Sequence, residues 1–198
     1  MHISILTFDG FNELDSFIAY GILNRVRRDD WRVTIASAVE RPRSMNGLVV
    51  DRQVSLAEAC SADAVLVGSG MQTRQIAADD GLMAQLHLDP ARQLLAAQCS
   101  GALLLAKLGL LNGIPACTDL TTRPWVVEAG VEVLEQPFFQ QGNIATAGGC
   151  LASVYLAAWL IWRLSGEAAA AQAIHYVAPL GEKDALVQRV LEQLRSSG

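Results

Sequence analysis

The sequence predicts a three-layer α/β sandwich, in which helices cover both faces of a mostly parallel central sheet. Short apolar segments typical of buried strands alternate with helical segments along the 198 residues. Hydrophobic residues make up 52% of the chain and charged residues only 18%, a balance that suits a sheet buried on both faces. We expect a single domain over residues 1–198, because the length suits one core and no repeat or linker interrupts the pattern.

The first half of the chain predicts a right-handed β-α-β unit followed by one further strand. Asp9 and Gly10 end the first strand with a turn signal, and Ser55 is placed to cap a short helix. The expected elements are strands at 3–8, 31–37 and 64–67, helices at 13–28 and 55–60, one or two helices within 72–86, and a possible short strand at 48–50.

The second half continues the alternation of strands and helices. Gly166 is placed to end a long apolar helix, and the residues around Pro115 predict a turn. The expected elements are strands at 94–97, 132–139 and 143–146, helices at 102–106, 150–164, 167–175 and 182–195, and turns at 112–115 and 140–142.

Charge and hydropathy narrow the class of partner. The net charge is −5, and the one cluster of arginines is followed directly by Asp29 and Asp30. The sequence therefore lacks the basic run that is typical of nucleic-acid binding. The most apolar long run, 150–162, is too short to span a bilayer, and the N-terminus predicts a strand rather than a signal peptide. We expect a small-molecule substrate, with no nucleic acid and no membrane as partner.

The four cysteines, Cys60, Cys99, Cys117 and Cys150, lie far apart in the sequence and form no CxxC pair. This spacing predicts no metal site and no disulfide framework, and we expect no cofactor. Free thiols are typical of a reducing compartment, so a cytoplasmic location is expected. Cys117 and Cys150 lack local features of a reactive thiol.

Cys99 lies where an apolar strand and an apolar helix meet without room for a loop. The chain must turn sharply there, and Gly101 lets the helix pack against the strand. This is the geometry of a nucleophile elbow, with cysteine in place of the usual serine. A thiol at a helix N-terminus is favoured as the thiolate. The alternative is that Cys99 is a small buried hydrophobe.

Two other strand ends are expected at the same edge of the sheet. Ser69 and Gly70 follow one strand. Their backbone N–H groups, together with the N–H of Ser100, can hold an oxyanion. The alternative is that this segment is a plain turn. Asp15 follows the other strand end. It is either an ordinary acid of the first helical turn or a neutral carboxyl that hydrogen-bonds the Cys99 thiolate and titrates together with it.

Asp119 is a further candidate, because it follows a turn after the elbow helix and can approach Cys99 from the other side. An aspartate at such a position is more often a turn former. None of the three histidines lies in one of the predicted site segments, so a Cys–His pair of the protease type is not expected.

The segments AQCSG, FDGFNELD and TAGGCLASVYLAAWLI resemble the ThiJ/PfpI superfamily, which includes the parkinsonism-associated deglycase. The resemblance covers nearly the whole chain and implies the flavodoxin-like, class I glutamine amidotransferase-like fold. FDGFNELD is most similar to isonitrile hydratases and to the sensor domains of AraC-type regulators. The resemblance implies Cys99 as nucleophile, Asp15 as its acidic partner, Ser100 beside it, Gly70 as oxyanion donor, and a homodimer.

The function implied is hydration of an isonitrile to an N-substituted formamide through a Cys99 thioimidate. Asp119 falls about where protease-like and deglycase-like members carry histidine, which argues against those activities. The segment that usually reads Thr-His-Trp is Thr118-Asp119-Leu120 here. The alternatives are an amidase-, protease- or glyoxalase-like hydrolase, a non-catalytic ligand-sensing domain, and a redox sensor. We expect no helix-turn-helix module after the domain.

Overall fold

A six-stranded sheet forms the centre of the protein, in the strand order β2-β1-β3-β4-β6-β5. The computed structural model describes residues 1–196, and residues 197 and 198 of the predicted domain lie outside the described residues. All neighbouring strands pair in parallel except β5, which is antiparallel to β6. The strands are β1 His2–Thr7, β2 Arg32–Ser37, β3 Ala64–Val67, β4 Leu94–Gln98, β5 Phe138–Gln141 and β6 Ile144–Ala147.

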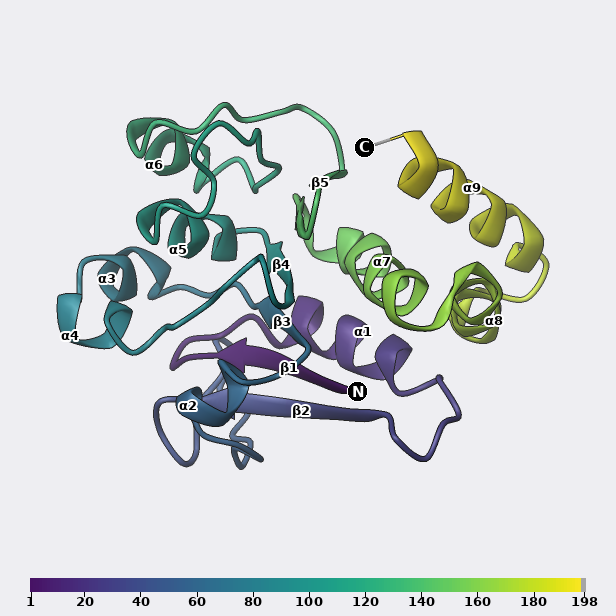
Figure 1. Cartoon of the computed structure of the whole chain (residues 1–198), viewed down its shortest axis with the longest axis horizontal. Helices are drawn as coiled ribbons and strands as arrows, with labels where there is room; N and C mark the ends of the chain where they lie inside the picture. Colours follow the sequence, from purple (N-terminus) through teal and green to yellow (C-terminus); the bar gives the residue numbers. More distant parts are fainter. Residues whose placement is uncertain (197–198) are drawn as a thin grey trace.

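Helices cover both faces of this sheet (Figure 1). One apolar core lies between the sheet and α1, α7, α8 and α9, and a second lies on the opposite face with the helices from α2 to α6. The predicted three-layer α/β class is therefore confirmed. The helices are α1 Glu13–Leu23, α2 Leu56–Ala59, α3 Thr73–Ala77, α4 Asp80–Met83, α5 Gly101–Lys107, α6 Arg123–Glu128, α7 Ser153–Ser165, α8 Glu167–Val177 and α9 Lys183–Ser196, with a 3-10 turn at Cys150–Ala152. Within residues 1–196, no helix has both the length and the apolar character that a membrane span needs.

The register of the parallel strands brings their carboxyl ends to one edge of the sheet. Val67 of β3 pairs with Ala97 of β4, and Gln98 of β4 pairs with Ala147 of β6. The residues that follow β3, β4 and β6 therefore begin at the same height beside one another. This edge is where ligands bind in open parallel sheets.

Several helix boundaries differ from those predicted. The first helix ends at Leu23 rather than at 28, because the Asn24 side-chain amide donates to the Tyr20 carbonyl and closes the last turn. Helix α6 was not expected, and the predicted long helix at 150–164 starts with a 3-10 turn. The N-cap at Ser55 is confirmed, since its hydroxyl accepts the Glu58 N–H at 3.2 Å.

The predicted strand at 132–139 is wrong. Pro137 has no N–H to donate, and β5 begins only after it, at Phe138. Upstream of it, Val133 forms one isolated bridge with Ala116. The turn expected at 140–142 is also displaced, because β5 continues to Gln141 and the hairpin turns at Gly142, with φ +60°, and the next residue. The possible strand at 48–50 is a single bridge between Arg43 and Val49.

Gly101 lies where α5 passes against the end of β3. A Cβ atom at this position would overlap the Val67 carbonyl oxygen and would lie 2.9 Å from the Gly68 carbonyl oxygen. Both are backbone atoms of a buried strand end, so neither can move without shifting the sheet. A glycine is therefore required for the helix to start directly after Cys99.

We predict that Gly101→Ala lowers the free energy of unfolding by about 1–3 kcal/mol, the usual cost of overpacking, measured by urea denaturation. Gly21→Ala is the control, because a Cβ at Gly21 in α1 has no atom within 4 Å. This substitution is expected to raise stability by about 0.5–1 kcal/mol. Equal effects of the two substitutions would contradict the close approach.

Candidate active site

Cys99 occupies a strained turn between β4 and α5. Its φ is +46°, and it is the one non-glycine residue with positive φ within residues 1–196. The turn is held from two sides: the Cys99 N–H donates to the Ala147 carbonyl at 2.8 Å, and the Thr118 hydroxyl donates to the Cys99 carbonyl at 2.8 Å. The predicted sharp turn is present, and strain of this kind is frequent at functional sites.

A cavity of about 300 Å³ opens at this edge of the sheet. Five of the residues predicted from the sequence line it, and the rest of its wall includes Asn12, two threonines, Cys150 and three apolar side chains. The predicted lining residues are Ser69, Gly70, Cys99, Ser100 and Asp119. The convergence of separate strand ends that the sequence analysis expected is thus present in the structure.

Asp15 lies beneath this cavity and is fully buried at the start of α1. A carboxylate oxygen of Asp15 lies within 4.8 Å of the Cys99 sulfur. The expected direct hydrogen bond to Cys99 is not formed, however. The carboxylate accepts the Ser69 hydroxyl on Oδ2 and the Ser16 hydroxyl, at 3.3 Å, on Oδ1. Ser69 therefore stands between the buried acid and the cavity.

The protonation state of Cys99 beside Asp15 differs from the predicted thiolate. The pKa of Cys99 is raised to about 12, mainly by burial and to a smaller extent by Asp15 and Cys150, against the opposing effect of the Gln98 amide N–H. Helix α5 has only seven residues, and the effect of its N-terminus does not outweigh the desolvation of the thiol. The resting thiol is therefore neutral at pH 7, which corrects the expectation of a thiolate.

The pKa of Asp15 lies closer to pH 7 than that of Cys99. Burial raises the pKa of Asp15 to about 6, although the hydroxyls of Ser69 and Ser16 favour the charged form. A carboxyl with this pKa changes its protonation state at little free-energy cost near neutral pH. It is therefore suited to donating and accepting a proton.

The predicted oxyanion donor Gly70 is engaged elsewhere. Its N–H donates to the Ser100 hydroxyl at 3.1 Å, and that hydroxyl also bonds the Thr73 hydroxyl at 2.8 Å. The backbone N–H groups of Ser69 and Ser100, by contrast, have no acceptor within residues 1–196. Both residues line the cavity, so their N–H groups stay candidates for the predicted oxyanion donors.

Asp119 lies at the cavity wall, but its carboxylate accepts hydrogen bonds from the residues that follow it in the chain. Its Oδ1 accepts the backbone N–H groups of Thr121 and Thr122, both at 3.0 Å. This is the turn-forming arrangement that the sequence analysis gave as the alternative. None of the three histidines lines the cavity.

Cys150 is the residue that the sequence analysis missed. Its sulfur lies within 4.8 Å of both the Cys99 sulfur and an Asp15 oxygen, so these three could hold a metal ion. The spacing in the sequence predicted no such site. A signal was present, because Cys150 follows β6 just as Ser69 follows β3, and β6 is the neighbour of β4.

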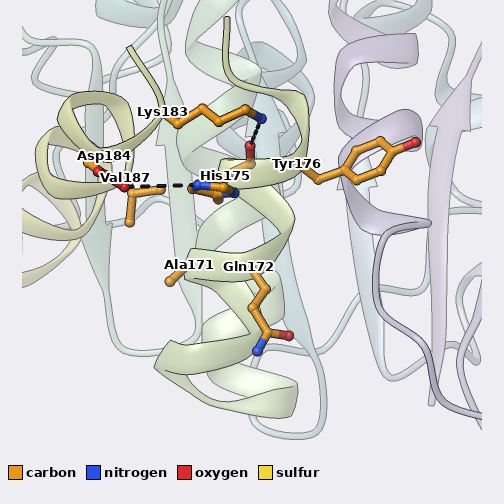
Figure 2. Close-up of a pocket in the computed structure, with 7 residues that line it drawn as sticks. All are labelled: Ala171, Gln172, His175, Tyr176, Lys183, Asp184 and Val187. Atoms are coloured by element: carbon orange, nitrogen blue, oxygen red, sulfur yellow. Dashed lines mark hydrogen bonds and ion pairs between the residues drawn. The ribbon is translucent and has the colours of Figure 1, made fainter. Parts of the chain in front are cut away.

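A second pocket, of about 560 Å³, lies between α8 and α9. Figure 2 shows two interactions among its polar groups: Lys183 donates to the His175 carbonyl at 2.6 Å, and His175 Nε2 lies 3.9 Å from Asp184 Oδ1. Tyr176 points away from this pair, and its ring lies under the Arg25 guanidinium. Among the described residues, the pocket is lined by no cysteine, serine or threonine, and it is remote in sequence from the Cys99 turn.

The fold and the site together define a class of protein, a three-layer α/β domain with a cysteine at a strained strand-to-helix turn. The sequence model of the DJ-1/PfpI family matches residues 1–161, and the chain belongs to this family. The resemblance noted from the three segments is thereby confirmed. No curated protein matches the chain significantly.

Solved structures show the same fold. Schizosaccharomyces pombe DJ-1 has a TM-score of 0.77 at 14% identity, covering 90% of this chain and 100% of that one. A THiJ/PfpI family protein from Pseudomonas syringae has a TM-score of 0.78 at 18% identity, covering 99% and 88%. An AraC family transcriptional regulator from Pseudomonas putida has a TM-score of 0.73 at 18% identity, covering 89% and 99%. At these identities the likeness is one of fold.

We predict that the Asp15 carboxyl makes stability fall as the pH rises from about 4 to about 6. Its folded pKa of about 6 exceeds the usual 3.8, so in this window the folded chain binds more protons than the unfolded chain. Asp15→Asn cannot titrate, so its stability relative to the parent chain should increase by up to about 3 kcal/mol between pH 4 and pH 7.

Urea denaturation at a series of pH values measures this difference. Asp51→Asn, which removes an exposed carboxylate, controls for the loss of one surface charge. Parallel pH profiles for Asp15→Asn and the parent chain would show that the buried carboxyl has an ordinary pKa.

Proposed function

We propose that the protein is a cysteine-dependent hydratase that adds water to an isonitrile and releases an N-substituted formamide. The observation that carries the proposal is the pairing of Cys99, on its strained turn, with a buried carboxyl whose pKa is about 6. An isonitrile carbon must receive both a proton and a nucleophile. A neutral thiol beside a carboxyl that exchanges protons near pH 7 supplies both.

In the first step, the protonated Asp15 carboxyl gives its proton to the Ser69 oxygen, and the Ser69 hydroxyl passes its own proton to the isonitrile carbon. A hydrogen bond already joins Asp15 Oδ2 and Ser69 Oγ. The Cys99 sulfur bonds to the same carbon, and the thiol proton passes to the Asp15 carboxylate. The product is a thioimidate on Cys99. The proton count is unchanged, because one proton enters the substrate and one returns to Asp15.

Water then adds across the carbon–nitrogen double bond of the thioimidate, with its oxygen on carbon and one proton on nitrogen. The carbon–sulfur bond breaks, the carbonyl of the formamide forms, and the hydroxyl proton returns to sulfur. In this proposal, the N–H groups of Ser69 and Ser100, for which no acceptor is present within residues 1–196, hold the polar intermediate. The reaction needs no organic cofactor, since the thiol performs the covalent chemistry.

The cavity suits a small substrate with an apolar substituent. Its volume of about 300 Å³ is at the lower end of the range for small-molecule sites. Met45, Met71 and Trp125 form apolar parts of its wall, and the Trp125 ring is fixed under the Arg74 guanidinium, 5.2 Å from the ring centroid. Methionine side chains adapt to different shapes, which favours simple alkyl or aryl isonitriles.

The test is turnover of a simple aryl isonitrile, followed by chromatographic detection of the formamide. Cys99→Ala is expected to abolish turnover, and Asp15→Asn to lower kcat by about 10²–10⁴-fold, the usual contribution of a positioned acid–base group. Cys60→Ser is the control, because Cys60 bonds the Gln85 carbonyl outside the cavity. Turnover that survives in Cys99→Ala, or no turnover in a folded parent chain, would reject the hydratase.

A ligand-sensing domain is the competing proposal. The engaged Gly70 N–H favours it, because this group is not available as the predicted oxyanion donor, and a neighbouring structure is an AraC family regulator. An amidase or glyoxalase finds less support, since no histidine lines the cavity to act as base. Saturable binding of the isonitrile without turnover, measured by calorimetry, would favour the sensor.

We also propose that the chain forms a homodimer in the cytoplasm, a compartment that suits its four free cysteines. Leu120 is 85% exposed and Leu151 is 72% exposed, and they adjoin the cavity residues Asp119 and Cys150. A partner surface covering both would bury apolar area beside the site.

Light scattering should give twice the chain mass for the parent chain. The double variant Leu120→Asp with Leu151→Asp should give monomers. A monomeric parent chain would contradict the dimer.

A further inference from the structure

We propose that Asp15, Cys99 and Cys150 bind one zinc ion at the base of the cavity. The three side chains come from the start of α1, the turn after β4 and the segment after β6, which meet at one edge of the sheet. One ligand atom from each lies within 4.8 Å of the other two. The inference goes beyond the proposed function and does not depend on it.

The spacing of the three atoms is close to that of a zinc site. With Zn–S bonds of about 2.3 Å and Zn–O bonds of about 2.1 Å, two ligand atoms at the tetrahedral angle on one zinc ion are about 3.6–3.8 Å apart. The three atoms lie within 4.8 Å of one another, so they would have to move together by about 1 Å or less to close around the ion. Two sulfurs and one carboxylate also favour zinc over magnesium or calcium, which prefer oxygen ligands.

Each of the three ligand groups already accepts a hydrogen bond from a neighbour. The Gln98 amide donates to the Cys99 sulfur at 3.1 Å, and the Asn12 amide donates to the Cys150 sulfur at 3.2 Å. The Ser69 hydroxyl donates to Asp15. Donors of this kind orient metal ligands and stabilise thiolates, and they are a regular part of metal sites.

A bound cation would compensate the charge that the three ligand groups carry once they are ionised. The two thiols and the carboxyl are all acids, and the lining of the cavity within residues 1–196 includes no lysine, arginine or histidine. Ionisation of all three would place several negative charges together without compensation. A divalent ion would compensate them, and three protein ligands would leave the fourth position of a tetrahedral ion for an exchangeable ligand.

Zinc at this position takes up the Cys99 sulfur. It would therefore compete with any reaction that uses Cys99 as the nucleophile, and chelation would restore that reaction. The sulfur of Cys150, which is partly exposed and lines two pockets, provides the accessible entry to the site.

The test is titration of the reduced, metal-free chain with zinc against a chromophoric chelator, with no substrate present. We expect one zinc per chain, and at least about 100-fold weaker binding in Cys150→Ser and Cys99→Ala, because each removes a direct ligand. Cobalt in place of zinc should give a sulfur-to-metal charge-transfer band in the parent chain and a weaker band in each variant. Cys60→Ser, outside the cluster, should bind zinc like the parent chain.

Absence of stoichiometric zinc uptake would overturn the proposal, and so would unchanged affinity in Cys150→Ser. Because Cys150 is partly exposed, this variant is expected to fold, as circular dichroism can verify. A Cys99–Cys150 disulfide that persists under reducing conditions, seen as loss of two hydrogens in the intact mass, would also overturn it. Turnover is measured separately with a chelator present, so failure of the hydratase leaves the zinc result unaffected.

Discussion

The strained turn at Cys99 is the constraint on which the rest of the site depends. β4 lies between β3 and β6 in the sheet, and the turn is held by the Ala147 carbonyl on one side and by the Thr118 hydroxyl on the other. Gly101 permits α5 to start against the end of β3. Contacts from neighbouring segments therefore hold Cys99 at a positive φ, a backbone conformation that a cysteine without such contacts would avoid.

Burial, more than local charge, sets the chemistry of this turn. A cysteine at a helix N-terminus is ordinarily activated, yet here desolvation by the sheet edge raises the pKa of the thiol. The same desolvation raises the pKa of Asp15 to about 6. The outcome is a neutral thiol beside a carboxyl that exchanges protons near neutral pH, an arrangement that suits addition of S–H across an electrophilic carbon.

The sequence predicted the elements whose pattern is local. The strands at β1, β3 and β4 and the long helices α7 to α9 follow from apolar runs and turn residues, and their positions were predicted within a few residues. The misplacement of β5 has a different cause, because the segment before Pro137 pairs only through one bridge to Ala116. Such pairing depends on a residue far away in the chain, which local patterns do not encode.

Residue type and order thus determined the fold class, the turn at Cys99 and the candidate residues Asp15, Ser69, Ser100 and Asp119. Only the tertiary structure decided what each of them does. It placed Cys150 beside Cys99, because β6 pairs with β4 across a separation of about fifty residues. It also assigned the Gly70 N–H to Ser100 and the Asp15 carboxylate to Ser69. Hydrogen-bond partners and desolvation depend on which chain segments meet in space, and a linear sequence does not state that.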